Sequence, residues 1–202
     1  MKKYYLKYIK KSIRIMKNIL KDSLRMQIVL GLLLIIILLS IFLTKFLISF
    51  VLIICTVLVS FIVNVLNIKI IGLELVTFTT VIFGFIYVPW VGGIFGFILI
   101  LMHLIVWQSF GEYVVWVVPE YIAAGVVAAF LAPTGIVMVG TGIISVIALL
   151  NIVFTNLFSN FNLGKYFIFA ITDVAFNVFL FTLFGETVIA FLKWLKSNIN
   201  IF

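Results

Sequence analysis

Long runs of apolar residues, separated by short breaks, dominate the chain after residue 27. A membrane-crossing helix needs about 20 consecutive apolar residues, and most of these runs come close to that length. The breaks hold glycine, proline, asparagine or charged residues, which are typical of turns. The pattern predicts seven spans, over residues 28–44, 46–66, 74–88, 92–110, 119–132, 135–158 and 166–191.

The stretch IFGFIYVPWVGGIFGFILILMH, residues 82–103, carries no charge and could cross a bilayer once as a single helix. The apolar pattern around it runs from Leu75 to Phe110, which is too long for one span and fits two short ones. Pro89 interrupts a continuous helix near the middle of this region. The sequence therefore predicts a short, glycine-rich helical hairpin with its bend near Pro89.

Small residues recur at helical spacing in this hairpin and in the span that follows it. Lipid gives helices no hydrophobic reason to associate, so they pack where small side chains let their backbones approach. We expect these positions either to pack helices of this chain or to dock a partner membrane protein. They are Gly84, Gly92, Gly96, Ala124, Ala128 and Ala132.

Nine of the fourteen lysine and arginine residues come before Gln27, interleaved with apolar residues at steps of three and four. This pattern predicts a basic amphipathic helix over residues 3–26 that lies on the cytoplasmic membrane face and binds anionic lipid head groups. A signal for membrane topology alone is the alternative. Nucleic acid is not an expected partner, because the side chains between the charges are aliphatic.

The composition of the whole chain also indicates a membrane protein. Hydrophobic residues make up 66% of the chain and charged residues 10%, against roughly half and a quarter in soluble domains. The predicted fold is all-α, a multi-pass helical protein of the cell membrane with six to seven transmembrane helices. Its expected parts are the amphipathic helix in residues 1–27, a transmembrane domain in residues 28–192 and a short tail in residues 193–202.

Basic residues also predict the orientation, because loops rich in lysine and arginine remain in the cytoplasm. With seven spans and a cytoplasmic N-terminus, eleven basic residues lie inside and three lie outside. If residues 28–44 do not cross the membrane, six spans remain and the C-terminus is cytoplasmic. Seven spans are the favoured interpretation, and both stay open.

Polar residues inside apolar spans are candidates for function, because burying them in lipid is costly. Their side chains could hydrogen-bond a ligand, and nearby aromatic rings could stack on it. A girdle at the membrane interface is the alternative for the aromatic residues, and pairing between helices is the alternative for Asp173. The candidate ligand-binding residues are Glu120, Asn151, Asp173, Asn177, Trp107, Trp116 and Tyr121.

Catalytic and metal-binding motifs are absent from the sequence. It contains no GxSxG, no HExxH and no GxxxxGK[ST]. His103 is the single histidine and Cys55 the single cysteine, which gives a zinc site poor support. We therefore expect neither an enzyme nor a bound cofactor or metal.

Three features occur in order along residues 46–191: the segment IKIIGLELVTFTTVIFGFIYVPWVGGIFGFI, the segment VPEYIAAGVVAAFLAP, and two long spans. This order resembles the substrate-binding S-components of energy-coupling-factor transporters. The resemblance implies a six-helix protein that captures a vitamin or metal and depends on a membrane coupling subunit and two cytoplasmic ATPases. Seven spans would invert the matched region relative to that family, so the resemblance implies that residues 28–44 do not cross.

Two other functions stay open. A non-catalytic membrane scaffold, resembling small rod-shape-type scaffold proteins, would bind partners through its basic N-terminal helix and its small-residue faces. A channel is the other, although no ring of charge or repeated filter sequence is present. A cavity lined by Glu120, Asn151 and Asp173 would favour ligand capture, whereas direct pairing of these side chains in a dry core would favour a scaffold.

Overall fold

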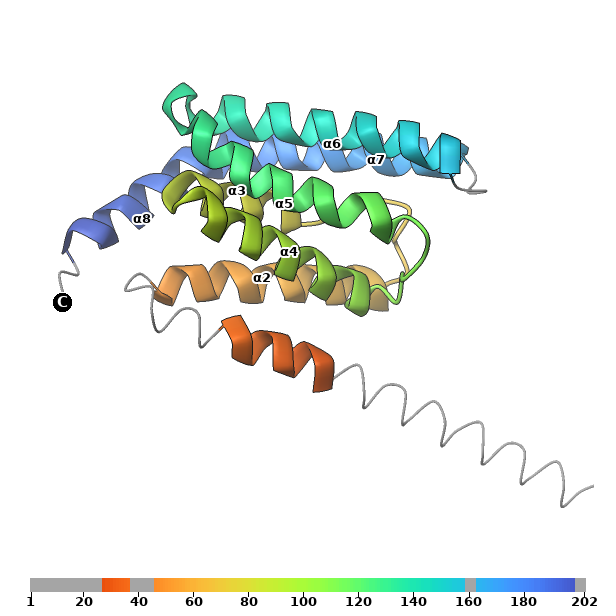
Figure 1. Cartoon of the computed structure of the whole chain (residues 1–202), viewed down its shortest axis with the longest axis horizontal. Helices are drawn as coiled ribbons and strands as arrows, with labels where there is room; N and C mark the ends of the chain where they lie inside the picture. Colours follow the sequence, from red (N-terminus) through yellow and green to blue (C-terminus); the bar gives the residue numbers. More distant parts are fainter. Residues whose placement is uncertain (1–26, 37–45, 159–162, 199–202) are drawn as a thin grey trace, which may run out of the picture. The chain divides into compact units, whose positions relative to one another are not determined.

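The computed structural model describes residues 27–36, 46–158 and 163–198 (Figure 1). The chain divides into two units, Met1–Leu39 and Ser40–Phe202. In the first unit the described residues form one apolar helix, Gln27–Ile36. The predicted amphipathic helix over residues 3–26 lies outside the described residues.

The described part of the second unit is helical, in agreement with the predicted fold class. A 3₁₀ turn at Ala132–Thr134 precedes α6, and a π-helical turn at Phe181–Gly185 joins α7 to α8. The α-helices are α2 (Phe46–Val65), α3 (Val76–Ile86), α4 (Pro89–Val106), α5 (Val114–Leu131), α6 (Ile136–Phe158), α7 (Leu163–Leu180) and α8 (Glu186–Asn198).

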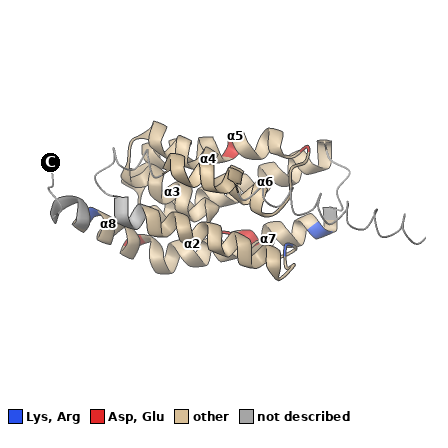
Figure 2. Ribbon diagram, turned by 90° about the horizontal axis from the view of Figure 1, so that it is seen from below, with Lys and Arg blue, Asp and Glu red and all other residues tan. Residues whose placement is uncertain are grey.

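Among the described residues, four helical stretches are long and apolar enough to cross a membrane: Pro89–Val106, Val114–Thr134, Ile136–Phe158 and Gly164–Trp194. Figure 2 shows charged residues at few places on these helices, with lysine positions near helix ends. Large apolar side chains such as Phe130, Met138 and Leu149 are more than 60% exposed. Such surfaces are compatible with an integral membrane protein, because lipid can cover them.

Glycines bring α3, α4 and α5 into close contact. A Cβ on Gly92 would lie 2.6 Å from the Cα of Gly84, and a Cβ on Gly96 would lie 2.9 Å from the Thr80 side chain. Gly125 of α5 packs backbone to backbone against Gly92. These pairs place α4 antiparallel to both α3 and α5, at a separation that larger side chains would prevent.

Polar and aromatic contacts place α2 and the π-helical turn after α7 beside the α3–α5 group. The hydroxyls of Thr56 in α2 and Thr79 in α3 lie 2.7 Å apart, and Trp107 Nε1 donates to the Ser60 carbonyl oxygen at 3.1 Å. On the other side, the rings of Phe78 and Phe181 are 5.0 Å apart. Gly140 of α6 leaves room for the Phe181 ring in the π-helical turn.

One predicted boundary was wrong. The break expected between Gly111 and Pro119 is shorter, because α5 begins at Val114 and contains Pro119. A proline near the start of a helix removes one backbone hydrogen bond, which membrane helices tolerate. Helix α8 continues as far as Asn198, into the residues that were expected to form the short tail.

Candidate functional site

The non-helical segment 66–75 enters the helical bundle before α3 begins. α3 has 11 residues, which is about 16 Å of helix against a hydrocarbon thickness of about 30 Å. Gly72 and Glu74 are buried in the segment before it. Backbone of this kind is tolerated at membrane depth only where protein groups satisfy it or where it lines a cavity.

Glu74 satisfies the first backbone donors of α3. Its carboxylate accepts hydrogen bonds from the backbone N–H groups of Val76 and Thr77, and the Thr77 hydroxyl lies 2.5 Å from Oε1. A carboxylate at a helix N-terminus is also favoured by the helix dipole. Glu74 therefore ends the 66–75 segment and fixes the start of α3.

The helices α2 and α4 both stop at the same end of the bundle. Each is followed by a residue with positive φ, Asn67 at 55° and Gln108 at 56°. The chain after α4 continues through Ser109 to Tyr113, whose hydroxyl donates to the Ser109 carbonyl oxygen. The left-handed backbone conformation of these two residues turns the chain across the end of the bundle. Space remains there beyond the start of the short α3.

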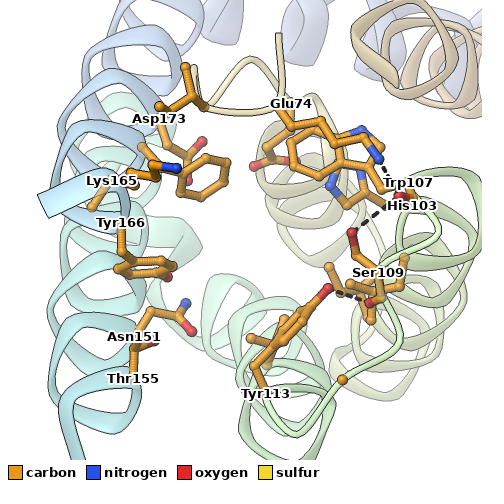
Figure 3. Close-up of a pocket in the computed structure, with 18 of the residues that line it drawn as sticks. Glu74, His103, Trp107, Ser109, Tyr113, Asn151, Thr155, Lys165, Tyr166 and Asp173 are labelled. Carbon is orange, nitrogen blue, oxygen red and sulfur yellow. Dashed lines mark hydrogen bonds between the residues drawn. The ribbon is translucent and has the colours of Figure 1, made fainter. Parts of the chain in front are cut away.

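A cavity of about 560 Å³ occupies this space between the 66–75 segment and helices α4 to α7 (Figure 3). Its volume is in the range of small-molecule sites. Figure 3 shows Tyr113, Ser109 and His103 across the cavity from Asn151, Thr155 and Tyr166. The polar and aromatic lining residues are Asn67, Lys69, Glu74, His103, Trp107, Gln108, Ser109, Phe110, Tyr113, Tyr121, Asn151, Thr155, Lys165, Tyr166, Phe169 and Asp173.

Charges of both signs line this cavity. Glu74 and Asp173 are 2% and 5% exposed, whereas Lys165 is exposed at the start of α7. Lys69 Nζ donates to the Trp107 carbonyl oxygen, and its partial burial lowers the pKa of the ammonium group. Both lysine side chains are therefore less buried than the two carboxyl groups.

The His103 and Tyr113 side chains present hydrogen-bonding groups on the α4 side of the cavity. The Ser60 hydroxyl donates to Thr56 O at 2.9 Å, so its oxygen accepts from His103 Nδ1 at 2.8 Å. His103 then has Nε2 as a hydrogen-bond acceptor. Burial raises the pKa of the Tyr113 hydroxyl, an effect that its hydrogen bond to Ser109 partly opposes.

Four of the seven predicted ligand-binding residues line the cavity: Trp107, Tyr121, Asn151 and Asp173. They come from the end of α4 and from α5, α6 and α7, and the helix packing brings them together. Their proximity is a finding of the structure. Their role in binding stays a prediction.

The other three predicted residues lie behind this lining. Trp116 Nε1 donates to Asn151 Oδ1 at 3.1 Å. Asn177 Nδ2 lies 2.9 Å from Asp173 Oδ1 and 3.4 Å from Glu74 Oε1, so its amide bridges two lining carboxyl groups. Glu120 is 8% exposed, and neither of its oxygens has a hydrogen-bond partner within the described part of the chain. The cavity is therefore lined by two of the three residues that were expected to define it.

The small residues predicted for packing or docking lie mainly inside the chain's own contacts. Gly84, Gly92 and Gly96 face α5 at close range, and Ala124 and Ala128 are buried in α5. Ala132 is half-buried at the 3₁₀ turn after α5. These residues thus pack α3, α4 and α5 together, and little of their surface is left for a partner.

Several lining residues were not predicted as binding residues, notably Glu74, Lys69 and Tyr166. Glu74 and Lys69 lie in the 66–75 segment, where hydropathy carries no information on depth. An acidic residue shortly before an apolar run, with a threonine three positions later, was the available signal for the capping role of Glu74.

Comparison of the chain with protein-family models, with curated proteins and with solved structures found no significant match. The cavity itself therefore carries the functional argument. It combines buried carboxyl groups, an amide, an imidazole and aromatic rings, which can position a small polar molecule. Within the described residues, no group of three or more histidine, cysteine or acidic side chains could hold a metal ion.

Proposed function

We propose that this chain captures a small polar molecule for a membrane transporter and lacks an ATPase of its own. The observation that carries the proposal is the cavity of about 560 Å³ with buried polar groups at its inner end. Polar groups in a membrane bundle are costly and are retained where they serve a substrate. The likeness to S-components adds support, and it makes a membrane coupling subunit and two cytoplasmic ATPases the expected partners.

The scaffold alternative has less support. Its argument was that small-residue faces would dock other membrane proteins, yet Gly92 and Gly125 are used in the packing of α4 on α5. Asn151 and Asp173 border an open cavity, whereas a scaffold would pair such residues in a dry core. A channel would need a continuous polar path, and the lining described here ends at the Glu74 cap.

Capture from outside the cell requires that the cavity open outward, and this requirement favours six spans. The cavity is bordered by residues 66–75, 107–113 and the start of α7, and we place all three on one side of the membrane. If that side is outside, Lys69 and Lys165 are the two outer basic residues, and the other twelve lie inside. This distribution follows the positive-inside rule more closely than eleven against three. Helices α2 to α7, with α3 and α4 as the short hairpin, then form the spans.

The orientation gives a prediction with two opposite outcomes. A fluorescent protein that folds only in the cytoplasm is expected to fluoresce when fused after residue 202, and an alkaline phosphatase fused there is expected to be inactive. The phosphatase fused after Gly111 is the control and is expected to be active, because this residue follows α4 on the cavity side. An active phosphatase at the C-terminus would contradict outward capture.

Native mass spectrometry tests the capture itself. Protein extracted from its own host in mild detergent is expected to carry a small molecule, which Ala148→Phe removes by filling the cavity. Ala148 lines the cavity and is 9% exposed. The matched control is Ala123→Phe on the exposed face of α5, which is expected to retain the molecule. Wild-type protein without a bound molecule, or Ala148→Phe that keeps it, would contradict the proposal.

A further inference from the structure

Asp173 is the buried carboxyl group of the cavity whose hydrogen bonding is least complete. Its side chain is 5% exposed, and Oδ1 accepts one hydrogen bond, from Asn177 Nδ2 at 2.9 Å. Among the described residues, the side-chain partner found for this carboxyl group is the Asn177 amide, which is neutral. An ionised carboxylate has about four acceptor sites, so most of this capacity faces the cavity unused.

Glu74, the second carboxyl group of the cavity, is in a different state. It accepts hydrogen bonds from two backbone N–H groups of α3 and from the Thr77 hydroxyl, and Tyr121 Oη lies 3.4 Å from Oε1. These donors stabilise its negative charge without any ligand. Glu74 therefore has a structural role, and Asp173 is the lining carboxyl group with acceptor sites left for a partner.

The position of Asp173 is fixed from two sides. On one side, a Cβ added to Gly72 would lie 2.7 Å from the Asp173 backbone, so the 66–75 segment touches α7 there. The backbone N–H of Gly72 also donates to Thr172 Oγ1 at 2.8 Å. On the other side, the Asn177 amide holds Oδ1. A preorganised carboxylate loses little entropy on binding a partner.

Aromatic rings stand next to this carboxyl group. Phe169 and Tyr166 lie one and two turns before it on α7, with ring centroids 5.8 Å apart. Trp107 meets Phe169 edge-on at 6.1 Å. All three side chains line the cavity. Such rings accommodate a flat organic body, and their faces also attract a cation.

We propose that Asp173 binds a protonated nitrogen of the captured molecule, so that the molecule is a small organic amine with a flat ring. The inference rests on the proposed capture function and names the class of its substrate. The nitrogen supplies the positive charge that Asp173 lacks, and the ring lies among Trp107, Tyr166 and Phe169.

Two fragments of equal shape test the charge requirement: 2-phenylethylamine and 2-phenylethanol. Their Kd values are measured by ligand-observed NMR with the protein in nanodiscs, and the signal from Ala148→Phe is subtracted as background. A charge-assisted hydrogen bond contributes about 1.5–3 kcal/mol, so the wild type is expected to bind the amine at least about tenfold more tightly than the alcohol. Asp173→Asn is expected to bring this ratio close to one.

Further variants separate a change in charge from a change in fold. Asp173→Glu keeps the charge and is expected to keep the preference for the amine. Glu112→Gln, a loss of charge at an exposed position before α5, is also expected to keep it. Equal binding of the two fragments by the wild type, an unchanged ratio in Asp173→Asn, or no binding of either fragment would overturn the inference.

The outcomes also distinguish this inference from the proposed function. If native mass spectrometry finds a bound molecule without a basic nitrogen, the capture function stands and the role of Asp173 falls. If the wild type carries no molecule and binds neither fragment, both fall.

Discussion

Gly125→Ala is expected to lower the free energy of unfolding of the helical bundle by about 3 kcal/mol. A Cβ at this position would overlap the carbonyl group of Gly92, and it would lie 2.8 Å from the Gly93 nitrogen. These are backbone atoms, so no side-chain rotation can relieve the overlap. α4 and α5 would have to separate, which also disturbs α3, because Gly84 packs against the same turn of α5.

A matched glycine makes this prediction specific. Gly142 lies in α6 with no atom within 4 Å of an added Cβ. Gly142→Ala is expected to leave stability unchanged or to raise it by up to about 1 kcal/mol, since alanine favours helix. In thermal unfolding of detergent-purified protein, Gly125→Ala is expected to lower Tm by roughly 6 to 12 °C. Similar Tm values for the two variants would show that close packing at Gly125 is not needed.

Glu74→Ala is expected to cost about 4 kcal/mol, because it leaves several buried donors without an acceptor. The N–H groups of Val76 and Thr77, the Thr77 hydroxyl and the Asn177 amide all direct hydrogen bonds to this carboxylate. No other described side chain caps α3. The start of α3 and the 66–75 segment would then lose their fixed positions.

Two variants serve as references for Glu74→Ala in the same thermal unfolding measurement. Glu74→Gln keeps one acceptor oxygen and is expected to lose about half as much stability. Glu112→Ala removes an exposed carboxylate and is expected to leave Tm unchanged. If Glu74→Ala were as stable as Glu112→Ala, the capping role assigned to Glu74 would be wrong.

The helical class of this protein could be predicted from the sequence because lipid as a solvent leaves few alternatives. Apolar runs of this length must satisfy their backbone internally, and the described runs are helices. The turn after Ile86 and the start of α4 at Pro89 also follow from the chemistry of proline at the first helical position. Pro119 was misinterpreted as a break for the same reason, since local propensity does not distinguish a helix start from its second turn.

The cavity could be predicted only in part. Asn151 and Asp173 were found because polar residues stand out in apolar helices, but depth along a helix does not say which way a side chain faces. Asn177 is one turn from Asp173, yet its amide lies behind the carboxyl group and bridges to Glu74. Lys69 lies in the 66–75 segment, and its approach to the cavity depends on the short α3, which no local pattern specifies.

The most direct measurement is an experimental structure of the protein extracted from its own host in mild detergent, with attention to the space between Glu74, Trp107 and Asp173. We expect density for a small molecule there, in contact with the Asp173 carboxylate and the aromatic rings of α7. A closed core, in which the side chains of α5 and α7 fill this space and Asp173 forms an ion pair with a basic residue of the chain, would contradict this expectation.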